Sequence, residues 1–207
     1  MGPYGNNAYI LHDASANDAL LVDMPLEEQP LLEAIAAVGN VHQIVATHWH
    51  RDHWMTYEPV RKATHAPVFV GDKEINIPAE RIDGLLSHGQ ELKVGAKRVT
   101  ILHTPGHTPG GICLQVGRAL ISGDTLFQGG PGRTSVIGDL QIIINSIVEH
   151  LHRLEDETIV MPGYGPNTTI GEAKREYAEY SKHPWPTDFF GDVAWLELPP
   201  TRSSEGV

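Results

Sequence analysis

The sequence predicts an α/β fold, because strand-like and helix-like stretches alternate along its 207 residues. Apolar residues alternate with polar or smaller ones at 7–12 and 98–103, a pattern typical of strands with one buried face. At 26–38 and 139–154 they recur at the spacing of a helix with one apolar stripe. A chain of this length buries one substantial core, so residues 1–207 are predicted to form a single domain.

The first third of the chain reads as strand, helix, strand. Residues 20–23 are predicted to form a buried strand, and residues 26–38 a helix that ends at Gly39. The short β-type run 43–46 then leads directly into the polar segment 47–53. This segment is expected to be a loop at the end of a strand, where α/β proteins place functional side chains.

The second half of the chain is predicted to continue the sheet and to cover it with helices. The runs 111–116 and 119–122 have strand character and are separated by turn glycines. Asp139 is expected to cap the striped helix, which is predicted to pack on the sheet. A further strand is predicted at 158–161, followed by a polar helix at 171–180.

Composition limits the function classes. The net charge of −11 argues against binding to nucleic acid or to anionic membranes, which requires clustered Lys and Arg, so we expect a small-molecule substrate. No apolar run approaches the length of a membrane span, and the N-terminus lacks the pattern of a signal peptide, so a soluble, cytoplasmic protein is expected.

Residues 181–207 are predicted to be a surface tail with frayed final residues. The single cysteine, Cys113, is predicted to be a buried, inert thiol.

Three histidines and one aspartate lie within six residues directly after the predicted strand 43–46. They are His48, His50, Asp52 and His53, in the order HxHxDH. Any one of these histidines alone would be explained as a surface or capping residue. Four residues of metal-ligating type clustered in one loop instead indicate a metal site.

Two further residues of metal-ligating type follow other predicted strands. His107 lies in a Pro/Gly-rich turn after strand 98–103, and Asp124 follows strand 119–122. Three imidazoles and a carboxylate, with one position left for water, are typical of catalytic rather than structural zinc. Such a metal lowers the pKa of its water to roughly 7 and so supplies a hydroxide nucleophile at neutral pH. The pattern therefore predicts hydrolytic chemistry.

Four motifs carry a resemblance to a known family. Residues 47–53, 104–108, 123–127 with Gly132-Arg133-Thr134, and 165–172 resemble the metallo-β-lactamase superfamily, in its glyoxalase II-like (hydroxyacylglutathione hydrolase-like) branch. The resemblance implies an αββα sandwich, in which two mixed sheets pack face to face with helices outside.

The resemblance also implies a two-metal site built from the residues singled out above. These are His48, His50 and His107 for the first metal, Asp52 and His53 for the second, and Asp124 as a bridge between the two. In the resembling enzymes a metal-bound hydroxide attacks an ester, thioester or lactone carbonyl. We therefore expect a hydrolase of this class in which Asp52 and Asp124 take part in catalysis.

One position departs from the family pattern. Where the last family motif reads Pro-Gly-His-Gly, this chain has Pro162-Gly163-Tyr164-Gly165. A neutral phenol is a poor zinc ligand at pH 7 because its pKa is near 10. We therefore expect one firmly bound zinc and a second site that is weak or empty.

Three interpretations of Tyr164 stay open. In a hydrolase with unequal metal sites, Tyr164 or Asp52 would position the water or stabilise an oxyanion. Alternatively, Tyr164 would bind a harder ion such as ferric iron as a phenolate, or the site would have little activity.

Other functions of this fold are also considered. Persulfide dioxygenases use one iron on a set that matches His48, His107 and Asp124, and they would not need the missing histidine. A metal-binding module without turnover is a further alternative. The glutathione thioester is disfavoured, because only about 35 residues follow the last motif. β-Lactam hydrolysis is disfavoured by the carboxylate of Asp124.

Neighbouring residues receive structural interpretations first. His103 is expected to orient the His107 turn by hydrogen bonding, and Arg133 to anchor the loop after Asp124 as a side-chain donor. Trp49 and Trp54 would either pack under the metal loop or form an apolar wall for substrate.

Overall fold

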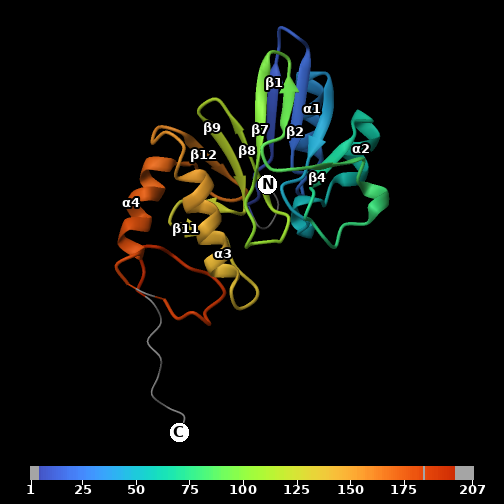
Figure 1. Ribbon diagram of the computed structural model, residues 1–207. Coiled ribbons are helices and arrows are strands. Elements are labelled where there is room, and N and C mark those ends of the chain that lie inside the picture. The colour runs from blue at the N-terminus through green and yellow to red at the C-terminus, as the bar shows by residue number, and fades with distance from the viewer. Residues whose placement is uncertain (1–4, 184, 199–207) are drawn as a thin grey trace.

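The computed structural model describes residues 5–183 and 185–198. Within them, the first sheet has five strands in the order β1-β2-β3-β4-β5 (Figure 1). Their bounds are β1 Tyr9–Asp13, β2 Asp18–Val22, β3 Val41–Val45, β4 Val68–Gly71 and β5 Gly84–Leu86. β1 and β2 are antiparallel, whereas β2 to β5 are parallel to one another.

The second sheet of the described chain has six strands in the order β13-β12-β9-β8-β7-β6. Their bounds are β6 Glu91–Val94, β7 Lys97–His103, β8 Ile112–Val116, β9 Ala119–Gly123, β12 Ile159–Pro162 and β13 Thr168–Thr169. All its pairs are antiparallel except β9 and β12, which run parallel. A short hairpin, β10 Leu126–Phe127 and β11 Gly130–Pro131, follows β9.

Helices cover the outer face of each sheet (Figure 1). The first sheet carries α1 Glu28–Val38 and α2 Tyr57–Thr64, and the second carries α3 Asp139–Ser146 and α4 Ile170–Tyr180. Short helical turns are η1 Arg51–His53, η2 Ala79–Arg81 and the π-helical η3 Ile147–Leu151. The αββα sandwich predicted from the sequence is confirmed.

The alternation of apolar side chains along the strands explains the layers. Successive residues of a strand point to opposite faces, so Leu20 of β2 packs between the two sheets while Leu21 packs against α1 and α2. In β8, Leu114 likewise packs between the sheets, and Cys113 faces the helices of the second sheet. Both sheets are therefore apolar on both faces, which a four-layer sandwich requires. Cys113 is buried as predicted, and burial raises the pKa of its thiol to about 11.

The predicted helix at 139–154 is correct in its apolar stripe but not in its regularity. α3 ends at Ser146 and continues as the π-helical turn η3. Asp139 is the first helical residue rather than the cap, because Gly138 occupies the cap position with a left-handed φ of 97°. Its carboxylate lies in the first turn, where its negative charge interacts favourably with the positive end of the helix dipole.

Two other parts of the chain differ from the sequence prediction. The segment expected to be a surface tail places Val193 and Trp195 in the core between the second sheet and its helices. The predicted fraying of the final residues, 199–207, lies outside the described residues. The helix α2 and the strands from β4 to β6 had no counterpart in the prediction. Among the described residues, no helix is long and apolar enough to cross a membrane.

His152, just after η3, is expected to make folding sensitive to acid. Burial, with a smaller contribution from Lys174, lowers the pKa of its imidazole to about 4, and its Nε2 atom is buried with no hydrogen-bond partner among the described residues. The unfolded chain therefore binds this proton near pH 6.5 while the folded protein does not. The stabilising contribution is complete above pH 6.5 and is lost as pH falls toward 4.

As pH falls from 6.5 toward 4, the free energy of unfolding of the variant His152→Phe is expected to decrease less than that of the unsubstituted protein. The difference should be about 1–2 kcal/mol after allowance for partial exposure. Phe keeps the ring contacts with Tyr177 and Trp195 and removes the unpaired nitrogen. Urea unfolding of both proteins at pH 7 and pH 4.5, with a chelator present, measures the difference. Equal losses in the two proteins would contradict the assignment.

Candidate metal centre

The HxHxDH loop follows the C-terminal end of β3, the central strand of the first sheet. Thr47 and His48 are buried directly after the strand, and η1 then turns the chain so that Asp52 and His53 face back toward them. The indole Nε1 of Trp54 donates to the His48 carbonyl at 2.7 Å and fixes the base of the loop. The strand end and the short turn together explain why the four candidate ligands of this loop converge.

The His107 turn approaches from the second sheet. The Nδ1 atom of His107 lies 2.7 Å from the Arg133 carbonyl, which accepts its hydrogen bond, so that Nε2 faces the site. His103 lies 2.9 Å from the Pro109 carbonyl through its Nε2, so it contacts this turn as expected. Arg133 anchors the turn through its backbone oxygen. Its guanidinium is exposed and lies 3.9 Å from Asp192, so the predicted side-chain role is wrong.

Asp124 comes from the end of β9 and lies between the two groups of histidines. Its Oδ2 is 3.4 Å from Nε2 of His107 and 4.0 Å from Nε2 of His48. Its Oδ1 is 3.4 Å from Nε2 of His53. This carboxylate therefore reaches both sides of the cluster.

Two overlapping sets of ligand atoms can each hold one cation. His48, His50 and His107 offer ring nitrogens within 4.8 Å of one another, and so do His48 and His53 with an oxygen of Asp124. Nδ1 of His50 lies 2.8 Å from Nε2 of His107. Asp52 adds a carboxylate 3.4 Å from Nε2 of His53. The structure thus brings together all six residues predicted as ligands.

The histidines differ in their protonation. Burial, reinforced by repulsion from His53, His107 and His50, holds the pKa of His48 well below its ordinary value. Burial and the neighbouring His107 lower the pKa of His50 to about 4. Neutral imidazoles are the form that binds a metal. These two residues therefore need no deprotonation at neutral pH.

His53 behaves in the opposite way. Burial lowers the pKa of its imidazole, but the carboxylates of Asp23 and Asp124 outweigh this effect and hold the pKa well above its ordinary value. Nδ1 of His53 lies 2.9 Å from Oδ2 of Asp23. A metal in the second set must therefore displace a strongly held proton.

Several atoms of the cluster fit a metal ion. Nε2 of His48, Nε2 of His53 and Oδ1 of Asp124 are buried and have no hydrogen-bond partner among the described residues. Such atoms are costly to bury unless a ligand or ion completes them. Gly163 keeps this space open, because a Cβ atom there would lie 2.2 Å from Oδ1 of Asp124. Imidazole and carboxylate donors with space between them fit a transition-metal ion such as zinc or iron.

Tyr164 lies next to the second ligand set. Its ring meets the ring of His53 edge to face, with 5.6 Å between the centroids. The turn around it is held by the N-terminal segment, since Asn7 donates from its side chain to the carbonyls of Pro162 and Gly165, both at 2.9 Å. Tyr164 therefore lies beside the second ligand set, where the sequence pattern led us to expect it.

Two supporting residues were not predicted from the sequence. Asp23 accepts hydrogen bonds from the backbone and hydroxyl of Thr47 and contacts His53, so it orients both halves of the loop. Asn6 is buried and donates to Oδ2 of Asp52 at 2.9 Å. Asp23 follows a buried strand, the same signal that identified Asp124. No sequence pattern marks Asn6.

A buried cluster of imidazoles and carboxylates at one edge of two packed sheets defines a metal-binding αββα protein. Residues 1–164 match the family described as the Metallo-beta-lactamase superfamily, and the chain belongs to this superfamily.

Relatives and solved structures agree with this assignment. The chain is 34% identical over 191 residues to the probable metallo-hydrolase YqgX of Bacillus subtilis, covering 82% of this chain and 90% of that protein. It is 30% identical over 194 residues to the hydroxyacylglutathione hydrolase GloC of Haemophilus influenzae, covering 83% and 91%. The crystal structure of TTHA1623 in a di-iron-bound form is similar with a TM-score of 0.73 and 30% identity, covering 84% and 95%.

The similarity to GloC bears on the glutathione thioester. The chain covers nearly all of that relative, which is named as a hydroxyacylglutathione hydrolase. The short segment after the last motif is therefore no ground for excluding this substrate.

Proposed function

We propose that this protein is a metal-dependent hydrolase of ester, thioester or lactone bonds in a small molecule. The proposed first metal site consists of His48, His50 and His107, with Asp124 shared between two sites. The proposed second site adds Asp52 and His53 and is weak because Tyr164 stands in place of an imidazole.

The observation that carries the proposal is the set of buried, unpartnered ligand atoms. Nε2 of His48, Nε2 of His53 and Oδ1 of Asp124 lie in one small volume, where a single cation would complete all three at once. When bound, a divalent metal lowers the pKa of a coordinated water toward roughly 7 and polarises a carbonyl oxygen.

The side chains around the ligands have separate tasks. Asn6 donates to Oδ2 of Asp52, which leaves the other carboxylate oxygen to orient a water or accept its proton. The hydroxyl of Tyr164 can donate a hydrogen bond and so stabilise an oxyanion. The carbonyl of Arg133 holds His107 in the tautomer that faces Nε2 toward the site.

The choice of metal is part of the proposal. Zinc is favoured by three imidazoles with a carboxylate, and iron is the alternative, supported by the di-iron-bound form of the similar structure TTHA1623. An iron enzyme of the persulfide dioxygenase type would use His48, His107 and Asp124, and would tolerate tyrosine at position 164.

Metal analysis combined with a substrate panel tests the proposal. The protein is purified without added metal, its zinc and iron are counted, and it is assayed with 4-nitrophenyl acetate, an acyl-glutathione thioester and a lactone. We expect about one zinc per chain and turnover that a chelator abolishes and added zinc restores. Iron, together with oxygen consumption on a glutathione persulfide, would replace the hydrolase by the dioxygenase. Bound metal without any turnover would leave a metal-binding module.

A further inference from the structure

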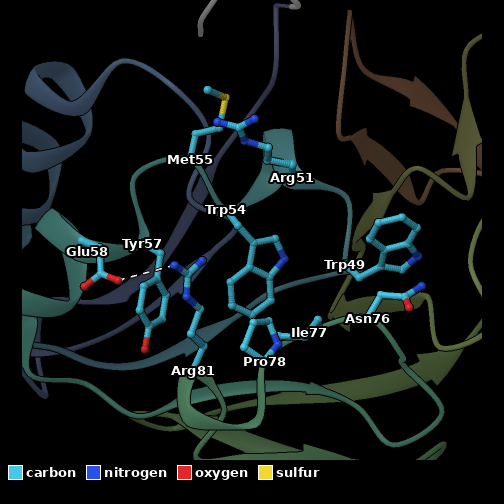
Figure 2. A pocket seen from close by; sticks show the side chains of 10 residues that line it. All are labelled: Trp49, Arg51, Trp54, Met55, Tyr57, Glu58, Asn76, Ile77, Pro78 and Arg81. Carbon is cyan, nitrogen blue, oxygen red and sulfur yellow. Dashed lines mark ion pairs between the residues drawn. The ribbon is translucent and has the colours of Figure 1, made fainter.

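A cavity of about 380 Å³ lies beside the metal-binding loop (Figure 2). Its walls come from residues 49–58, which include the end of the loop and the start of α2, and from residues 76–81, which follow β4. The indole of Trp49 lies 4.5 Å from the ring of His50, centroid to centroid. One wall of the cavity is therefore in contact with a proposed metal ligand.

One part of this cavity is apolar. It is formed by the indoles of Trp49 and Trp54 with the side chains of Met55, Ile77 and Pro78. Trp54 is buried and held by its hydrogen bond to the His48 carbonyl. The volume lies in the usual range for small-molecule sites, and such walls accept an aromatic or compact aliphatic group.

Two guanidinium groups line the same cavity. Arg81 lies 3.6 Å from Glu58 and stacks over the ring of Tyr57 at 5.1 Å, so its charge is already partnered (Figure 2). Arg51 is exposed and has no carboxylate partner within 4.0 Å among residues 5–183 and 185–198. In a protein with a net charge of −11, a free guanidinium at this position attracts anions where the overall field repels them.

The cavity shares two lining residues with a second cavity beside the metal centre. Arg51 and Met55 also line a second cavity of about 440 Å³, whose other lining residues are Asp52 and Tyr164. In Figure 2 the side chains of Arg51 and Met55 lie together at one edge of the first cavity, beside Trp54. A molecule with its reacting carbonyl near Asp52 and Tyr164 can therefore extend over Met55 toward the two tryptophans.

We infer that this cavity and Arg51 select the substrate, an ester or thioester that carries an aromatic or compact apolar group with a carboxylate. The apolar group packs between the indoles, and the carboxylate pairs with the Arg51 guanidinium, which offers two parallel donors. The identity of the bond that is cleaved rests on the function proposed above. The selection of an anionic, apolar molecule rests on the cavity itself.

Two isosteric substrates test this selection. They are the 4-nitrophenyl esters of 4-carboxyphenylacetic acid and of 4-carbamoylphenylacetic acid, which differ in charge but hardly in shape. We expect kcat/KM to favour the carboxylate on the order of tenfold, the size of one charge-assisted hydrogen bond. The variant Arg51→Gln should abolish the preference, and Arg51→Lys should retain part of it, because an ammonium keeps the charge but not the paired donors.

Arg98→Gln is the matched control. Arg98 lies on β7, its side chain is 71% exposed, and it pairs with Glu91 at 3.2 Å. Its replacement removes the same charge from the protein without changing the cavity. The preference for the carboxylate ester should therefore be unchanged in this variant.

Direct binding separates this inference from the proposed reaction. The N-methylamides of the same two acids are titrated against tryptophan fluorescence, since two of the four tryptophans of the chain line the cavity. Tighter binding of the carboxylate amide that depends on Arg51 supports the inference even if no ester is cleaved, an outcome that would reject only the hydrolase. Equal binding of both amides, binding of neither, or a preference that survives in Arg51→Gln overturns the inference.

Discussion

The variant His107→Ala is expected to lose its bound metal and nearly all its activity. The metal content should fall from about one per chain toward zero, and kcat/KM should fall by at least about a hundredfold. Loss of a residue that only orients a metal ligand typically lowers metal affinity or activity by about 10–100-fold, so loss of the ligand itself should have a larger effect. Among the described residues, His107 is the only imidazole of the cluster that comes from the second sheet.

The structure indicates that the fold should survive this change. His107 lies in a turn at the edge of the sheet and belongs to none of the three apolar clusters. His183→Ala, at an exposed position after α4, is the control for loss of one histidine. Metal analysis and ester turnover are measured on both variants after circular dichroism shows that they are folded. Full metal content in His107→Ala would mean that the cation binds elsewhere and would reject the proposed site.

The convergence of the candidate ligands could be predicted from the sequence because their positions follow a simple physical rule. Side chains near the ends of buried strands meet at one edge of a sandwich. Asp124 directly follows such a strand, and His48 lies three residues after the end of another. The spacing within 48–53 then required only a short turn, which η1 provides. Local pattern and final geometry agree here, since each group of candidate ligands follows a strand: β3 for residues 48–53, β7 for His107 and β9 for Asp124.

The supporting contacts were harder to predict because they join segments that are far apart in the chain. Asn6 and Asp52 are separated by 46 residues, and Asn7 and Pro162 by 155, so no local pattern connects them. The burial of Trp195 has the same origin. Trp195 lies in a segment rich in proline and glycine that has no periodicity, and its place among the rings of Tyr177 and Tyr180 appears only in three dimensions.

The same long-range contacts explain why Tyr164 can be tested cleanly. The turn that carries it is held by backbone and side-chain bonds of the N-terminal segment, including Asn7 N–H to the Gly163 carbonyl at 2.8 Å. None of these bonds uses the Tyr164 side chain. A substitution there should therefore change the ligand set of the second site without moving the turn.

The variant Tyr164→His is accordingly expected to raise the metal content from about one toward two per chain. The new imidazole would stand beside His53 and join Asp52, His53 and Asp124, which completes a four-ligand set. A stronger second site also provides the driving force to displace the proton that the neighbouring carboxylates hold on His53. Metal analysis after dialysis against a fixed low zinc concentration measures the change.

Tyr164→Phe is the matched control, because it keeps the aromatic ring and removes only the hydroxyl. If the phenol does not bind metal, the Phe variant retains about one metal per chain and only the His variant gains a second. If metal content falls in Tyr164→Phe and does not rise in Tyr164→His, the tyrosine is already a working ligand, and the unequal two-site arrangement proposed here is wrong. An activity loss in Tyr164→Phe at constant metal content would instead assign the hydroxyl to oxyanion stabilisation, since the hydroxyl is the only group that this variant removes.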